Sequence, residues 1–172
     1  RTQGRLVGGN LAVLAAMAGS KFLPSLDGAI LFLEDVNEYI YRVDRMLSTL
    51  KLAGVLQRVA GVVLGAFTNC EPGDGFGTLT LDEVFDDYFK SLNVPVFRGA
   101  QFGHIRKKWT LPIGLPVEMD ASAGTLRLAI CSGASQSVLR SQAPGKKGHT
   151  GPARPRSLLG LATKVLIQSA TV

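Results

Sequence analysis

The chain has 172 residues, of which 46% are hydrophobic, and a formal net charge of +6. This length and apolar content suit one domain with a core, and no segment is long enough to span a bilayer. All thirteen acidic residues and thirteen of the nineteen lysines and arginines lie within residues 1–136, so the excess charge belongs to residues 137–172. The excess positive charge is therefore a property of the tail and does not indicate a basic binding face on the domain. We expect neither nucleic acid nor a membrane as a partner.

The tail is rich in glycine, proline, serine and basic residues. Such a composition cannot bury enough apolar surface to offset the entropy of ordering. We therefore expect one domain over residues 1–136 and a tail over residues 137–172 that is disordered or non-native, with a functional basic arm as the alternative. The chain starts at Arg1, without an initiator methionine, and we expect it to be cut from a longer protein.

The first predicted element is a short helix. Asn10 is a suitable N-cap for residues 11–18, and Gly19 can end the helix in the left-handed conformation. The preceding Gly8-Gly9 pair is interpreted as a turn where a neighbouring backbone approaches closely. A phosphate cradle is a poor alternative, because the rest of a nucleotide-binding fingerprint is missing.

Strands and helices then alternate. The apolar run of residues 29–33 predicts a strand that is buried on both faces. Apolar residues at helical spacing predict a helix over residues 39–53, ended by Gly54. Residues 61–67 form a second apolar run and predict another buried strand.

The second half of the chain predicts a helix followed by shorter strands. Residues 68–78 read as an exposed loop, and the capping-box sequence Thr80-Leu-Asp-Glu83 opens a helix. The strands predicted after this helix are residues 94–97, 110–113, 117–120 and 125–130. The predicted fold class is therefore mixed α/β, with antiparallel pairing at the C-terminal end.

Two groups of residues could suggest a metal site, and neither predicts one. The acids Asp82, Glu83, Asp86 and Asp87 lie at the start of a predicted helix, where negative charge meets the helix dipole favourably and faces solvent. Cys70 and Cys131 lack metal-ligand spacing and indicate core or loop residues in a reducing compartment.

The strongest chemical signal is a carboxylate and a histidine, each at the end of an apolar run. Glu34 follows residues 28–33, and His104 closes residues 94–103; the only other histidine lies in the tail. A carboxylate that orients an imidazole and stabilises its protonated form is a charge-relay pair. Asp35 would point to the opposite face if the strand continued, so only one of the two carboxylates can meet a given histidine.

Several separated motifs, spread over about residues 3–130, together resemble the C-terminal domain of the LD-carboxypeptidases, which are serine peptidases of murein-peptide recycling. The related microcin C self-immunity peptidases share this architecture. The resemblance implies a mixed sheet of the swivelling type, a cytoplasmic enzyme and a homodimer. The motifs are Leu6-Val-Gly-Gly-Asn-Leu11, Gly28-Ala-Ile-Leu-Phe-Leu-Glu-Asp-Val36 with Glu38, Tyr41-Arg-Val-Asp-Arg45, Gly65-Ala-Phe67, and Gly99-Ala-Gln-Phe-Gly-His104 with Leu111-Pro-Ile-Gly114.

In that family the serine of a Ser–Glu–His triad lies in an N-terminal domain, and the other two residues come from the C-terminal domain. Carried over by motif, the acid is Glu34 of Leu33-Glu-Asp and the base is His104 of Phe102-Gly-His. The implied substrate is a muropeptide tetrapeptide, cut at the L,D bond before its terminal D-Ala. The resemblance implies no metal and no cofactor.

The chain departs from the family in its serines. Ser20, Ser25 and Ser48 lack the strand-to-helix turn of a nucleophile elbow, and Ser132 and Ser135 follow the last predicted strand. We therefore expect the serine domain to be missing from this chain and the fragment alone to be inactive.

Three other functions stay open at this point. A microcin C immunity-type serine peptidase would differ in its substrate pocket and not in the catalytic pair. In a non-catalytic α/β binding module the pair would be incidental, with Glu34 a surface acid beside Arg42 or Arg45 and His104 a loop residue. A nucleic-acid binder would act through the basic tail, and its binding would depend on salt.

Overall fold

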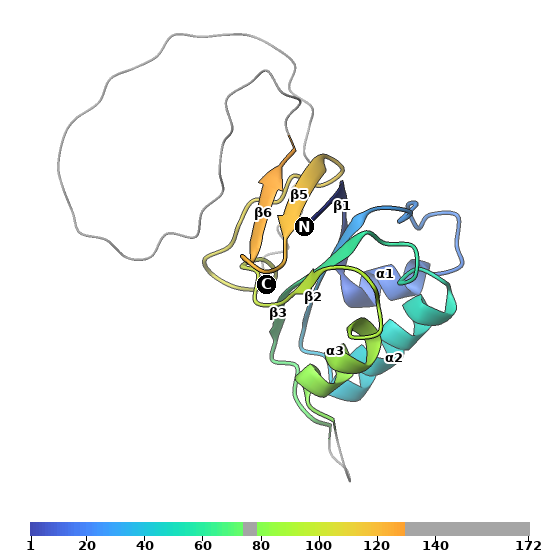
Figure 1. Cartoon of the computed structure of the whole chain (residues 1–172). Coiled ribbons are helices and arrows are strands. Elements are labelled where there is room, and N and C mark those ends of the chain that lie inside the picture. The colour runs from blue at the N-terminus through green and yellow to red at the C-terminus, as the bar shows by residue number, and fades with distance from the viewer. Residues whose placement is uncertain (74–78, 130–172) are drawn as a thin grey trace, which may run out of the picture. The chain divides into compact units, whose positions relative to one another are not determined.

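The computed structural model describes residues 1–73 and 79–129, which form three helices and six strands (Figure 1). All of these residues belong to one compact unit. Among them, no helix has the length and apolar character needed to cross a membrane. In chain order the elements are β1 (Thr2–Asn10), α1 (Leu11–Met17), β2 (Ile30–Val36), α2 (Ile40–Leu52), β3 (Gly61–Thr68), α3 (Leu81–Phe89), β4 (Val96–Phe97), β5 (Pro116–Asp120) and β6 (Thr125–Leu128).

The six strands form one mixed sheet in the order β4-β3-β2-β1-β5-β6. Strands β1 to β4 pair in parallel, whereas β5 pairs antiparallel with both β1 and β6. The predicted fold class, mixed α/β with antiparallel strands at the C-terminal end, is confirmed.

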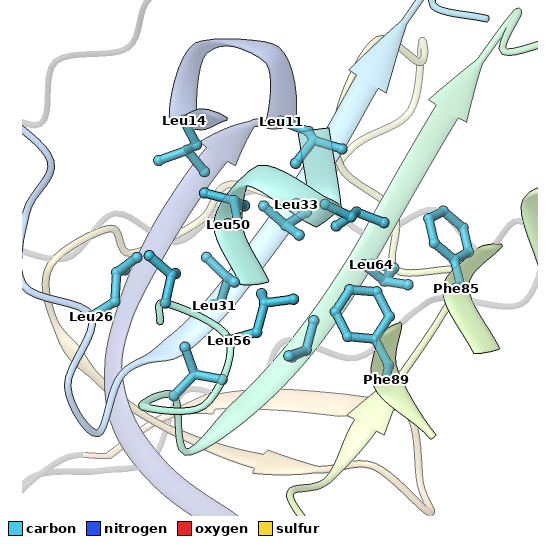
Figure 2. Close-up of a cluster of buried hydrophobic side chains, with 14 of the residues drawn as sticks. Leu11, Leu14, Leu26, Leu31, Leu33, Leu50, Leu56, Leu64, Phe85 and Phe89 are labelled. Atoms are coloured by element: carbon cyan, nitrogen blue, oxygen red, sulfur yellow. The ribbon is translucent and has the colours of Figure 1, made fainter. Parts of the chain in front are cut away.

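The helices α1, α2 and α3 all lie on one face of the sheet (Figure 1). Each helix connects one parallel strand to the next, and each new strand is added on the same side of the last one, so right-handed crossovers bring all three helices to one face. Figure 2 shows the core between these layers, where Leu31, Leu33 and Leu64 of the strands meet Leu50 of α2 and Phe85 of α3.

The opposite face of the sheet is covered by the segment that follows β4. Phe32 and Val63 of the sheet pack there with Phe97 and Phe102, and Trp109 packs against the same cluster. The sheet is therefore buried on both faces, as the continuous apolar runs predicted.

The predicted helix boundaries are confirmed to within a residue or two. The Asn10 side chain accepts the Val13 N–H at 3.2 Å, and Gly19 follows α1 with a φ of 80°. Thr80 and Glu83 form the predicted capping box of α3.

The strand β1 was not predicted, because its glycine pair was interpreted as a turn. The strand pairs with β5 through residues 2–5 and with β2 through residues 6–10. A Cβ at Gly8 would lie 1.9 Å from the carbonyl oxygen of Phe32, so β1 can approach β2 only because residue 8 is a glycine. The expected close backbone approach is therefore present, but within a strand.

Three predicted strands differ from the observed ones by more than one residue at an end. The strand predicted over residues 29–33 is β2 and continues to Val36, so Glu34 lies within it and not after it. The strand predicted over residues 94–97 is only two residues long in β4. The strand predicted over residues 125–130 is β6, which ends at Leu128.

The strand predicted over residues 110–113 is wrong. Pro112 has no N–H to donate, and the Ile113 N–H bonds instead to the Leu111 carbonyl at 3.0 Å, so the chain turns. It rejoins the sheet one residue later, where the Gly114 N–H donates to the Leu6 carbonyl at 2.7 Å. The predicted domain boundary at residue 136, the prediction that residues 137–172 are disordered or non-native, and Cys131 lie outside the described residues.

Candidate active site

Glu34 and His104 meet at the end of the sheet. Nδ1 of His104 lies 2.8 Å from Oε2 of Glu34, within the range of a charge-assisted hydrogen bond. The glutamate side chain is 11% exposed, whereas the imidazole is 45% exposed. A buried carboxylate therefore contacts an imidazole that remains accessible, and the contact uses Nδ1, which leaves Nε2 as the ring nitrogen for proton transfer.

The alternation of β2 decides which carboxylate meets the histidine. Ile30 and Phe32 face the cluster on the side opposite the helices, and Glu34 follows them on that face. The predicted opposite orientation of Asp35 is confirmed, since its carboxylate accepts the Ala12 N–H at 3.0 Å on the helix side.

Asp35 joins the end of β2 to the start of α1. Besides the Ala12 N–H, its carboxylate accepts the Asn10 amide at 2.8 Å and its own strand's Val36 N–H at 2.8 Å. The side chain is 2% exposed. A buried charge with three donors is satisfied, so the residue stabilises the backbone beside Glu34.

The loop that carries His104 is held close to Glu34. Gly103 has a φ of 105°, and a Cβ there would lie 2.9 Å from Glu34 Oε2. The Thr68 hydroxyl donates to the His104 carbonyl at 3.3 Å, which ties the loop to the end of β3. Residue 103 is therefore a glycine for two reasons, the backbone conformation and the space that the glutamate needs.

The structural alternative for Glu34 was an ion pair with an arginine of α2. Arg42 instead lies with one guanidinium nitrogen 3.5 Å from Oε2 of Glu38. Within residues 1–73 and 79–129, the ionisable side chain that contacts the Glu34 carboxylate is that of His104. The surface-acid interpretation of Glu34 therefore fails on geometry.

Of the four acids that were predicted to lie at the start of the helix, Asp82 and Glu83 are in the first turn of α3, whereas Asp86 and Asp87 lie further along it. Glu83 forms the capping box, and Arg98 pairs with both Asp82 and Asp86, at 2.7 Å in the case of Asp82. These contacts pair three of the four acids, Asp82, Glu83 and Asp86, with groups of the protein itself.

Cys70 carries a thiol, a potential nucleophile, close enough to Glu34 for that carboxylate to affect its pKa. Partial burial raises the pKa of its thiol, and the carboxylates of Asp35, Glu38 and Glu34 raise that pKa further. A thiol with a raised pKa stays protonated and is a poor nucleophile. The site can therefore orient an imidazole and stabilise its protonated form, but the described residues do not add an activated nucleophile to it.

Sequence reasoning found the acid and the histidine but missed the residues that hold them. Gly103 and Gly65 were part of quoted motifs without a stated role, and Thr68 was placed in a loop. A glycine next to a candidate catalytic residue was the available signal, because such glycines often mark close packing.

Comparison with known proteins identifies the family to which the chain is similar. A family described as LD-carboxypeptidase C-terminal domain matches residues 3–119. A putative carboxypeptidase of Synechocystis is 42% identical over 124 residues, which is 72% of this chain and 41% of that protein. A protein of Bacillus subtilis named probable murein peptide carboxypeptidase is 36% identical over 140 residues, covering 81% of this chain and 43% of the relative.

Solved structures give the same result. The crystal structure of muramoyltetrapeptide carboxypeptidase from Oxalobacter formigenes aligns with a TM-score of 0.63 and 35% identity, over 75% of this chain and 42% of that one. The chain thus spans about two fifths of the length of the proteins that it matches.

Proposed function

Because the chain belongs to the LD-carboxypeptidase family, through the C-terminal domain of that family, we propose that it supplies the acid and the base of a Ser–Glu–His triad. The observation that carries this proposal is the 2.8 Å contact between Glu34 Oε2 and His104 Nδ1. It joins two residues that the family motifs single out, and it leaves the imidazole accessible.

Each residue has a definite role in the proposed reaction. Nε2 of His104 takes the proton of the attacking serine as a general base and later gives it to the leaving amine as a general acid. Glu34 accepts the Nδ1 proton of His104, which keeps Nε2 unprotonated in the resting state, and it stabilises the imidazolium once that forms.

The nucleophile belongs to another part of the enzyme in this proposal. The predicted elements offer no serine at a nucleophile elbow, and the relatives contain more than twice the length that this chain matches. The serine and the oxyanion hole would come from an N-terminal domain. Since removing one member of a triad leaves little of the catalysis, the chain alone would be inactive.

The proposed substrate is a murein tetrapeptide, and the proposed reaction is hydrolysis of the L,D bond that releases the terminal D-Ala. The proposal rests on the names of the relatives, which describe a murein peptide carboxypeptidase and a muramoyltetrapeptide carboxypeptidase. We also propose that the enzyme is cytoplasmic, forms a homodimer and needs no cofactor.

The test uses a fusion protein, the joined enzyme, in which this chain replaces the matching segment of the Synechocystis relative. The N-terminal part of the joined enzyme is that of the relative. Release of D-Ala from a murein tetrapeptide is measured for the joined enzyme, for the chain alone and for the intact relative. We expect release from the joined enzyme and the relative and none from the chain alone.

A second substrate separates the family's two branches. A folded joined enzyme that ignores the tetrapeptide but hydrolyses an aminoacyl sulfamoyl nucleoside would point to the microcin-type alternative. A folded joined enzyme with neither activity, beside an active relative, would favour the non-catalytic binding module.

A further inference from the structure

The strands β2 and β3 lose their register beside the catalytic pair. Leu33 pairs with Leu64, but the next pair along the ladder joins Asp35 to Phe67. Two residues of β3, Gly65 and Ala66, therefore stand opposite the single residue Glu34 of β2. This is a β-bulge, a feature that re-aims side chains and backbone groups next to active sites.

The bulge turns β3 toward the segment that carries the histidine. The Ala66 N–H donates to the Phe102 carbonyl at 2.9 Å, and the Ala100 N–H donates to the Leu64 carbonyl at 3.1 Å. Residues 100–102 thus continue the hydrogen bonding of the short strand β4 along β3. This pairing delivers Gly103 to the side of Glu34.

Gly65 makes this close approach possible. A Cβ on residue 65 would lie 2.4 Å from Cε2 of Phe102 and 2.8 Å from the Phe102 carbonyl oxygen. Phe102 cannot easily yield, because it is 3% exposed and packs edge-on against Phe32 with ring centroids 5.6 Å apart. Any side chain at residue 65 would therefore push out the loop on which His104 lies.

We propose that Gly65 is a positioning residue for His104. Because residue 65 has no side chain, Phe102 can pack against the bulge of β3, and this packing holds the imidazole of His104 beside Glu34. The proposal concerns the geometry of Glu34 and His104. Of its two tests, only the measurement of turnover rests on the proposed function. Gly65 acts through Phe102, the residue that a side chain at position 65 would meet.

The test compares two glycines of the same strand. Gly65→Ala places a methyl group against the ring and the backbone carbonyl of Phe102. The control Gly61→Ala places one 2.6 Å from the flexible terminal methyl group of Met119, 3.0 Å from Cγ2 of Thr2 and 3.2 Å from the Pro95 carbonyl oxygen. Both variants crowd β3, but only the first contacts the loop of His104. If Gly65→Ala does not fold, the milder variant Phe102→Leu is measured in its place. This variant keeps an apolar side chain at the position of the Phe102 ring but changes its packing against residue 65.

The first readout uses the full chain and needs no reaction. Imidazole ¹⁵N shifts report which ring nitrogen carries the proton, and the two histidine signals are assigned with a His149→Gln variant. We expect the Nδ1–H form of His104 in the unsubstituted chain and in Gly61→Ala. In Gly65→Ala, or in Phe102→Leu, we expect a shift toward the Nε2–H form and faster exchange of the Ala66 amide.

The second readout is turnover of the joined enzyme. We expect Gly65→Ala to lower kcat by roughly 10²-fold with little change in KM, since small misplacements of reacting groups cost about this much. Gly61→Ala should leave kcat unchanged. If both glycine variants behave alike in the ¹⁵N spectrum, or if Gly65→Ala keeps the Nδ1–H form, Gly65 does not position His104. If the joined enzyme releases no D-Ala at all, the proposed function fails, and the spectrum still decides the role of Gly65.

Discussion

Glu34 and His104 are separated by 70 positions in the chain, yet Oε2 of the first lies 2.8 Å from Nδ1 of the second. Their contact depends on three separate features. These are the face of β2 on which Glu34 follows Ile30 and Phe32, the bulge of β3, and the glycine at residue 103. Substitutions in each of these features should therefore affect the pair in different and measurable ways.

Replacing the histidine tests the proposed base directly. In the joined enzyme, His104→Ala should lower turnover by roughly 10³-fold or more, because the serine proton then has no acceptor. The measurement is D-Ala release from a murein tetrapeptide at saturating substrate. His149→Gln removes the other histidine of the chain and should leave turnover unchanged; equal losses in both variants would remove His104 from the mechanism.

Substitutions of the adjacent carboxylates Glu34 and Asp35 should have different effects, the first on turnover and the second on stability. Glu34→Gln should lower turnover by a factor comparable to that of His104→Ala or somewhat smaller, because a neutral partner no longer selects the tautomer or stabilises the imidazolium. Asp35→Asn should instead lower the free energy of unfolding by roughly 1–3 kcal/mol, because asparagine keeps only one of the two acceptor oxygens and turns an NH2 group toward an N–H donor. Urea unfolding and turnover are measured on both variants. An inactive Asp35→Asn beside a nearly unaffected Glu34→Gln would reverse the assignment.

A side chain at residue 103 should disturb the pair itself. Gly103 and Gly99 both have positive φ, so alanine at either position should cost about 1–2 kcal/mol of unfolding free energy through backbone strain. Only Gly103→Ala also brings a Cβ within 2.9 Å of Glu34 Oε2, whereas residue 99 has open space around its Cβ position. Gly103→Ala should therefore lower kcat by roughly 10²-fold and Gly99→Ala should not. Similar kcat values for the two variants would show that the contact with Glu34 does not matter.

Stability should fall in acid through Asp120. The Ser122 hydroxyl, the Arg1 guanidinium and the Ala123 N–H all donate to this carboxylate, and they hold its pKa well below the usual range. Because the pKa is lower in the folded than in the unfolded state, the unfolded chain binds more protons in acid. The contribution of Asp120 is therefore fully present above the ordinary carboxyl pKa and is lost as the pH falls below it.

The measurement is urea unfolding of the chain at a series of pH values between neutral and acidic. Asp120→Asn should lower the unfolding free energy near neutral pH and flatten its decline in acid. Ser122→Ala, which removes the donor with the largest effect, should produce part of the same flattening. An unchanged acid decline in Asp120→Asn would mean that other carboxylates cause it.

Local features of the fold could be predicted from the sequence because they depend on neighbours along the chain. Asn10 caps α1, the box of Thr80 and Glu83 opens α3, and the apolar runs of β2 and β3 are buried, as expected. The identity of Glu34 and His104 as the candidate pair also came from the sequence, through motifs shared with a family. In each case the signal lies in residue types and spacings within a short segment.

Pairing between distant segments could not be predicted in this way, and the tertiary structure decided it. β1 is a strand because its backbone bonds to β2 and β5, although its glycines suggest a turn. The bulge at Gly65 and the docking of Phe102 follow from register between β2, β3 and the loop after β4. The sequence by itself determined which carboxylate and which imidazole are available. The tertiary structure determined that they touch, because the hydrophobic pattern of a strand fixes which face is buried but does not say which distant segment pairs with it or where a bulge shifts the pairing.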